Sequence, residues 1–136
     1  SPMMYNIFTG RGGVLKRRND DICILVSSLH RVKAKALQFI FTDRHAYPQL
    51  ARYFNDIKQL NEIDWSLLQA RNFTRNPDDP EQIERYQAEA LILDHLPIEA
   101  LLGIVCYTKD VKTMLDSELE NRSLTLNIQV IPGWYF

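Results

Sequence analysis

The hydrophobic positions of this chain are concentrated in short segments, some continuous and some interrupted by a polar residue, that are separated by polar or basic stretches. Such runs occur at residues 22–26, 39–41, 88–93, 103–107 and 126–131, and many of their side chains are β-branched or aromatic. Runs of this length and composition are typical of β-strands. Because the run at 22–26 contains no polar residue, we expect that strand to be buried on both faces.

A different spacing follows Pro48. Apolar residues recur there mainly at offsets of three and four, and they are Leu50, Tyr53, Phe54, Ile57 and Leu60. This spacing places them on one stripe of a helix, and a proline is well tolerated in a helix's first turn. The pattern therefore predicts a half-buried helix that begins at Pro48 and runs to about residue 60.

Capping residues mark three more helical segments. Ser28 precedes a short basic segment at 29–36, Asp64 precedes 65–70, and Thr108 precedes a helix with an apolar face. That face consists of Val111, Met114, Leu115 and Leu119. A loop at 76–80 leads into a further helix at 81–86, and residues 97–102 form a helical turn between two strands.

The order of these elements shows no regular alternation of strand and helix, which favours the α+β class with a mixed or antiparallel central sheet and flanking helices. A chain of 136 residues fits one domain, here residues 1–136. Hydrophobic residues make up 46% and charged residues 24% of the chain, which excludes disordered, collagen-like and coiled-coil proteins.

No apolar stretch approaches the roughly 20 residues that a membrane span needs, and residues 1–5 do not resemble a signal peptide. We therefore expect a soluble, cytoplasmic protein without a membrane partner. Cys23 and Cys106 each lie inside an apolar run, which indicates two reduced core residues. The spacing of histidines and cysteines matches no zinc motif, so no metal site is expected.

The net charge of −1 hides an uneven distribution. Residues 1–54 carry nine basic and three acidic side chains, whereas residues 55–136 carry seven basic and fourteen acidic ones. A basic half can face phosphate groups while the net charge of the whole chain remains small. The alternative is that the cluster from Arg11 to Arg18 is a solvated loop that binds nothing.

Glu89 is the strongest candidate for chemistry because it lies in the apolar segment Gln-Ala-Glu-Ala-Leu-Ile-Leu at 87–93. An ionised carboxylate buried without partners costs several kcal/mol, so it must be paired or face a cleft. It either forms an ion pair at a sheet edge, for example with Arg85, or points into a pocket. His45 follows a strand directly and either works in a site or only bonds to Asp43. Trp65, Phe73 and Tyr86 could stack on bases or belong to the core.

Several blocks together resemble the DarT family of toxins. They are Ser-Pro-Met-Met-Tyr at 1–5, Ile-Leu-Val-Ser-Ser at 24–28, Phe-Thr-Asp-Arg-His at 41–45, Asp-Trp at 64–65, Gln-Ala-Glu at 87–89 and Trp-Tyr-Phe at 134–136. The resemblance spans the chain, and its most specific parts are the blocks at 41–45 and 87–89. It implies a partial ADP-ribosyltransferase-like fold and an enzyme that transfers ADP-ribose from NAD to thymidine in single-stranded DNA.

The resemblance implies a role for particular residues. Glu89 corresponds to the family's catalytic glutamate, and His45 and Arg44 correspond to the part of the cleft that receives NAD. Single-stranded DNA is expected to contact Phe73 and Arg75, and also Arg52 and Tyr5. A macrodomain antitoxin is the expected protein partner. Phe73 stands where the family tends to have tryptophan, and Ala90 where it tends to have a large aromatic that would be buried.

Family members carry a further segment before the block at 1–5, with a His-x-Thr that holds NAD and an essential arginine. Neither occurs in this sequence, so the chain is expected to be the C-terminal two-thirds of such an enzyme, to bind NAD weakly and not to modify DNA alone. A non-catalytic module that binds single-stranded DNA or a partner remains an alternative. A structural domain that forms homo-oligomers through an exposed edge or apolar patch is another.

Overall fold

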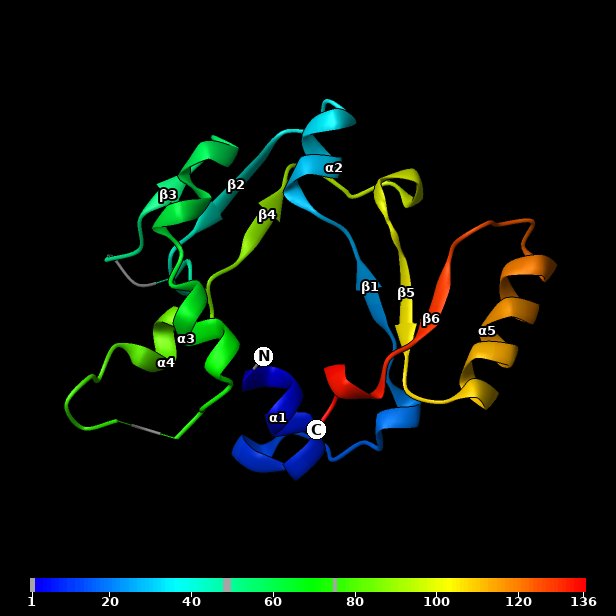
Figure 1. Cartoon of the computed structure of the whole chain (residues 1–136), viewed down its shortest axis with the longest axis horizontal. Helices are drawn as coiled ribbons and strands as arrows, with labels where there is room; N and C mark the ends of the chain where they lie inside the picture. Colours follow the sequence, from blue (N-terminus) through cyan, green and yellow to red (C-terminus); the bar gives the residue numbers. More distant parts are fainter. Residues whose placement is uncertain (1, 48–49, 75) are drawn as a thin grey trace. The chain divides into compact units, whose positions relative to one another are not determined.

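The computed structural model describes residues 2–47, 50–74 and 76–136. Its internal contacts divide the chain into two compact units (Figure 1). The first unit consists mainly of Val32–His95, and the second consists of Met3–Arg31 together with Leu96–Phe136. Each unit contains one three-stranded sheet and helices, so the predicted α+β class is confirmed. The strands are divided between two sheets, however, and do not form the single central sheet that we expected.

The sheet of the first unit has β2 in the middle. It contains β2 (Phe39–Thr42), β3 (Tyr53–Phe54) and β4 (Ala90–Ile92), in the order β3-β2-β4 with antiparallel pairing throughout. Phe41 is opposite Phe54 in the ladder, and their ring centroids are 5.3 Å apart. This buried aromatic pair forms much of the core of the unit, because side chains opposite each other in a ladder share one face of the sheet.

The predicted helix from Pro48 to residue 60 is wrong. Tyr53 and Phe54 form β3, and a 3₁₀ segment follows at Ile57–Glu62. The Asp56 carboxylate accepts a hydrogen bond from the Lys58 backbone N–H, which starts that segment as a separate element. Helical spacing over so few residues is a weak signal, and pairing with the buried strand β2 outweighs it. Pro48 itself lies outside the described residues.

The remaining helices of the first unit confirm the predicted ones. Asp64 caps α3 (Trp65–Ala70) through a 3.0 Å hydrogen bond from the Leu67 backbone N–H. After the loop, α4 spans Gln82–Arg85. The chain then enters β4, which brings residue 89 to the end of the sheet.

The sheet of the second unit has the order β1-β5-β6. It contains β1 (Ile24–Val26), β5 (Gly103–Cys106) and β6 (Ile128–Val130), with β1 antiparallel and β6 parallel to β5. Helix α5 (Lys109–Asn121) begins after its cap Thr108 and packs on a core cluster of Ile104, Cys106 and Ile128. The predicted strand and helix positions in this part of the chain are therefore confirmed.

Gly103 allows the close approach between β5 and the segment that enters β6. A Cβ atom at position 103 would lie 2.3 Å from the carbonyl oxygen of Asn127, which is far inside van der Waals contact. The same oxygen accepts a 2.8 Å hydrogen bond from the Ile104 backbone N–H. Only glycine leaves room for this parallel pairing.

Short helices complete the second unit and its junction with the first. They are α1 (Pro2–Thr9), α2 (Leu29–Ala34) and 3₁₀ segments at Arg11–Gly13, Asn19–Asp21, Ile98–Ala100 and Pro132–Trp134. As predicted, Ser28 caps α2, because its hydroxyl accepts from the Arg31 backbone N–H at 3.1 Å. No helix in the described part of the chain has the length and apolarity needed to span a bilayer.

Three burial predictions need correction. The β1 strand is not buried on both faces, because Leu25 is 60% exposed. Cys23 is exposed and not a core residue, whereas Cys106 is buried as predicted. Ala90 is also exposed, because it lies on β4 at the edge of its sheet. A continuous apolar run does not reveal whether a strand has a covering layer on one face or on both.

Replacing Tyr135 with phenylalanine is expected to lower the free energy of unfolding of the second unit by about 1–2 kcal/mol. Its buried hydroxyl lies 3.0 Å from the Val105 carbonyl oxygen and 3.1 Å from that of Ile22. Burial raises the pKa of Tyr135 to about 12. A group whose pKa is higher in the folded state contributes its full stability below the unfolded value of about 10 and loses it as the pH rises toward 12.

Urea unfolding at neutral pH and between about pH 10 and 12 measures both effects. The alkaline loss of stability should be smaller in Tyr135→Phe than in the unchanged chain. Tyr47→Phe, at an exposed tyrosine, is the control and should change neither quantity. Equal alkaline losses in the unchanged chain and in Tyr135→Phe would contradict the prediction.

Candidate active site

Glu89 lies at the end of the first unit's sheet, one residue before β4. Its carbonyl oxygen accepts a 2.9 Å hydrogen bond from the Thr42 backbone N–H, so the pairing of β2 with β4 extends to residue 89. The backbone N–H of Glu89 donates to the Thr42 hydroxyl at 3.3 Å. The position of the Glu89 backbone is thus set by the last residue of β2.

The Glu89 carboxylate bonds to the loop that follows β2. Its Oε1 atom accepts a 2.7 Å hydrogen bond from the Ala46 backbone N–H and lies 3.2 Å from Nδ1 of His45. The Glu89 side chain is 37% exposed, so part of it is in contact with solvent although Oε1 is hydrogen-bonded. Arg85, the alternative partner considered from the sequence, pairs with Asp79 and Asp64 instead.

His45 is placed beside Glu89 by its backbone as well as by its ring. The His45 backbone N–H donates to the Glu84 carbonyl oxygen at 3.0 Å, which ties this loop to α4. Its Nδ1 atom also lies 3.3 Å from the Tyr47 backbone N–H. The unprotonated Nδ1 can accept from Tyr47, and the protonated Nδ1 can donate to Glu89. Two groups therefore lie within hydrogen-bond distance of the same ring nitrogen.

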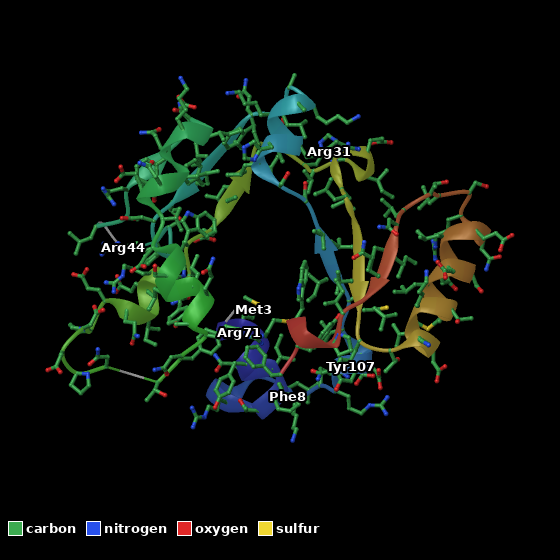
Figure 2. The ribbon with its side chains drawn as sticks, viewed as in Figure 1. Met3, Phe8, Arg31, Arg44, Arg71 and Tyr107 are labelled. Carbon is green, nitrogen blue, oxygen red and sulfur yellow. The ribbon has the colours of Figure 1, made fainter. Side chains whose placement is uncertain are left out.

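Arg44 extends from the same loop (Figure 2), and its guanidinium group is already paired. It lies 2.9 Å from a Glu81 carboxylate oxygen and 3.5 Å from Asp43. The Asp43 carboxylate is buried and accepts from both the backbone N–H and Nε of Arg52, at 3.0 and 2.9 Å. Arg52 also contacts Glu62 at 2.9 Å. A network of ion pairs therefore anchors both ends of the loop that carries His45.

The residues predicted to bind DNA are divided between the two units, with Phe73 and Arg52 in the first and Tyr5 in the second. Phe73 is half-buried and meets the Tyr86 ring edge-on at a centroid distance of 4.8 Å. Arg75 lies outside the described residues. Arg52 is engaged by Asp43 and Glu62, as above. Tyr5 belongs to the second unit, where its ring contacts Phe136 and the guanidinium group of Arg11.

A groove of about 580 Å³ also lies along β2 and β4, with Ile40 and Leu91 among its lining residues. Glu89 and His45 are not among the described residues that line it. Nor do the described residues contain a group of three or more histidine, cysteine or acidic side chains that could hold a metal ion. The groups in contact with the Glu89 carboxylate are the His45 imidazole and the Ala46 backbone N–H.

Sequence reasoning missed the groups that position Glu89. Thr42 and Ala46 carried no signal, because one acts through a buried hydroxyl and the other through its backbone N–H. Tyr53, whose hydroxyl donates to the Ala46 carbonyl oxygen, was assigned to the incorrect helix. Asp43, which the sequence offered as the alternative partner of His45, accepts from Arg52 instead, and the His45 ring lies beside Glu89.

Replacing Asp43 with asparagine is expected to destabilise the first unit by about 1–3 kcal/mol at neutral pH. Burial alone would raise the pKa of Asp43, but hydrogen bonds from Arg52 and the charges of Arg44 and Arg52 outweigh it and lower that pKa. A carboxyl whose pKa is lowered on folding stabilises the protein above its unfolded value, near 3.8, and loses this contribution as the pH falls through the folded value.

Chemical denaturation of both proteins from pH 7 down to about pH 2 checks this. The stability difference between the unchanged chain and Asp43→Asn should shrink only below about pH 4. Asp78→Asn, at an exposed loop carboxylate, is the matched control. A stability difference that does not change with pH would mean that the ionised carboxylate contributes nothing.

The model of the family described as "ssDNA thymidine ADP-ribosyltransferase, DarT" matches residues 1–136. A DNA ADP-ribosyl transferase of Escherichia coli O127:H6 is 50% identical over 136 residues, which are all of this chain and 62% of that protein. Thermus sp. 2.9 DarT in complex with carba-NAD+ matches with a TM-score of 0.89 and 29% identity, over 100% of this chain and 68% of that one.

A second structure, Thermus sp. 2.9 DarT in complex with ADP-ribosylated ssDNA, also matches with a TM-score of 0.89, over 64% of its chain. The chain thus spans somewhat less than two-thirds of the E. coli relative. The family model, the identity to that relative and the structural match agree with the resemblance noted in the blocks at 41–45 and 87–89. This chain belongs to the DarT family of ssDNA thymidine ADP-ribosyltransferases.

Proposed function

We propose that this chain carries the catalytic glutamate of an enzyme that transfers ADP-ribose from NAD to thymidine in single-stranded DNA, and that Glu89 is this residue. The observation that carries the proposal is the state of the Glu89 carboxylate. It is oriented by the Ala46 N–H and by His45, it has no arginine or lysine among its recorded ion-pair partners in the described residues, and it is partly exposed. Such a carboxylate can promote the transfer of ADP-ribose from NAD to thymidine, which is the reaction of the family.

The chemistry follows from the bond that must break. Cleavage between nicotinamide and ribose passes through an oxocarbenium-like state, and a carboxylate that binds the 2′-hydroxyl or faces the sugar ring stabilises its charge. The same carboxylate can accept the proton released by the attacking base nitrogen. The Ala46 N–H donates to Oε1 of Glu89, so we assign the contact with the sugar and the uptake of the proton to the second carboxylate oxygen, Oε2.

His45 and Arg44 are proposed to contact NAD. His45 lies beside Glu89 and presents a ring that can donate once protonated. The Arg44 guanidinium group is bound to Glu81, a partly exposed carboxylate, so a pyrophosphate would have to replace Glu81 as its partner. Arginine suits that exchange, because its planar donors match phosphate oxygens.

Phe73, Arg75, Arg52 and Tyr5 are proposed to contact the DNA strand. Phe73 is half-buried and meets the Tyr86 ring edge-on, and aromatic side chains of this kind can stack on bases. Arg52 would contribute positive charge while remaining bound to Asp43 and Glu62. A strand bound this way should dissociate more readily as the salt concentration rises.

We also propose that the enzyme acts in the cytoplasm as the toxin of a toxin–antitoxin pair with a macrodomain partner. Thermus DarT has been seen with NAD+ and with ADP-ribosylated ssDNA, which supports NAD and DNA as substrates here. The chain corresponds in this proposal to the C-terminal two-thirds of the enzyme. Self-association of the chain is proposed as well, and a clean monomer in light scattering would contradict it.

A transfer experiment tests the function. The matched part of the E. coli relative is replaced by this chain, and the chimera is given labelled NAD and a thymine-containing single-stranded oligonucleotide. Transfer of label to the DNA is expected. A chimera that folds and binds DNA without any transfer would contradict catalysis and favour the non-catalytic binding module. Calorimetric titration of the 136 residues alone with NAD should show weak binding, and a micromolar Kd would contradict that.

A further inference from the structure

We propose that the Thr42 hydroxyl is a positioning residue that holds Glu89 and the His45 loop in register. This inference rests on the proposed role of Glu89 and adds a residue to it. Thr42 is the last residue of β2 and is fully buried. Its backbone and its side chain both contact the segments that form the site.

The hydroxyl joins two pieces of backbone that are far apart in the sequence. Oγ1 of Thr42 donates its proton to the Arg44 carbonyl oxygen at 2.6 Å and accepts from the Glu89 N–H at 3.3 Å. A hydroxyl has one proton to donate and two lone pairs that accept, so a single side chain can serve both bonds. No apolar side chain of the same shape could do so.

One of the two bonds holds the loop that carries His45, and the other holds the backbone of Glu89. The bond to Arg44 folds the loop back directly after β2, which places the His45 ring and the Ala46 N–H at the Glu89 carboxylate. The bond from Glu89 fixes the backbone that carries this carboxylate. Tyr53 adds a contact from β3, because its hydroxyl donates to the Ala46 carbonyl oxygen. Without the Thr42 hydroxyl, the loop would be joined to Glu89 mainly through the Glu89 carboxylate, which contacts Ala46 and His45. That carboxylate is also the group that must bind substrate.

The Thr42 hydroxyl is fully buried, and the two bonds that it makes are partly buried. If the hydroxyl is removed, the Glu89 N–H and the Arg44 C=O each lose a partner at a place with limited access to water, so the loop is expected to move to satisfy them. Such a movement separates the Ala46 N–H from the carboxylate. Displacements of this kind reduce catalysis by groups that must be aligned within fractions of an ångström.

The test uses NMR spectroscopy of the full ¹⁵N-labelled chain and needs neither NAD nor activity. Glu89→Gln should displace the Ala46 amide resonance, because it removes the charge of the carboxylate that accepts from this N–H. In Thr42→Val, which keeps the shape but lacks the hydroxyl, Glu89→Gln should no longer displace the Ala46 resonance. In Thr42→Ser, which keeps the hydroxyl, Glu89→Gln should displace it as in the unchanged chain.

Destabilisation alone must not produce this result. Ile63→Val, at a buried position of the same unit, should lower the unfolding midpoint and leave the displacement of the Ala46 resonance by Glu89→Gln unchanged. If Thr42→Val does not fold, Thr42→Cys takes its place, because a thiol has a similar size and is a weak donor. An unchanged displacement in Thr42→Val or Thr42→Cys, or its loss in Thr42→Ser, would overturn the proposal.

The chimera separates this inference from the proposed function. There, Thr42→Val should reduce kcat/KM for ADP-ribose transfer at least tenfold, and Thr42→Ser should restore it. If the chimera with Thr42 intact transfers nothing, the proposed function fails while the NMR result still decides the positioning. An unchanged kcat/KM in Thr42→Val, or its loss in Thr42→Ser, would contradict a positioning role.

Discussion

Replacing Glu89 with glutamine is expected to reduce ADP-ribose transfer by the chimera about 100- to 1000-fold. Glutamine has nearly the same shape, and its carbonyl oxygen can still accept from the Ala46 N–H. The fold of the loop should therefore persist while the negative charge that stabilises the sugar cation is lost. Initial rates with labelled NAD and a thymine-containing oligonucleotide measure the effect.

The control for this experiment is Glu99→Gln. Glu99 is an exposed glutamate of the second unit, and its recorded contact to Arg31 uses its backbone oxygen rather than its carboxylate. Its rate should stay within about twofold of the unchanged chimera. A Glu89→Gln chimera that retains full activity would remove Glu89 from the reaction, whatever the family relationship.

Replacing Phe41 with alanine is expected to lower the free energy of unfolding of the first unit by about 3–5 kcal/mol. Phe41 is 2% exposed and packs against Phe54 in the middle of the sheet. Its removal leaves a cavity between strands that cannot collapse freely, because both partners are held in the β2–β3 ladder. The loss is a large share of the stability of a small unit.

Ile40→Ala is the matched control, since Ile40 is the preceding residue on β2 and points to the opposite face, where it is 38% exposed. Its substitution should cost about 1 kcal/mol or less. Urea unfolding followed by circular dichroism compares the two variants. Equal losses of stability would show that the core of the unit does not lie on the Phe41 face.

The sequence predicted most of the elements in the second unit, because local signals there agreed. The run at 103–107 and the cap at Thr108 with its apolar stripe both describe structures that form as expected. The helix predicted from Pro48 shows the opposite case. Its spacing was as regular as that of a real helix, yet Phe54 gains more by pairing with Phe41 than a short isolated helix would provide.

The candidate site divides in a similar way. Glu89 could be found from the sequence, because a carboxylate within an apolar segment needs a reason to be there. His45 could be suspected from its place after a strand. The interaction between them could not be predicted, since it depends on the β2–β4 register that brings residue 42 beside residue 89.

The amino-acid order by itself therefore determined most of the strands and capped helices, though not β3, and which carboxylate is unusual, because these depend on neighbours within a few residues. Only the tertiary structure decided that the strands form two sheets, that Leu25 and Cys23 face solvent, and that Thr42 links Glu89 to the His45 loop. Those outcomes depend on pairing between residues distant in the chain. Such pairing is selected by the burial and hydrogen bonding of the whole unit, and a local sequence pattern does not reveal either of them.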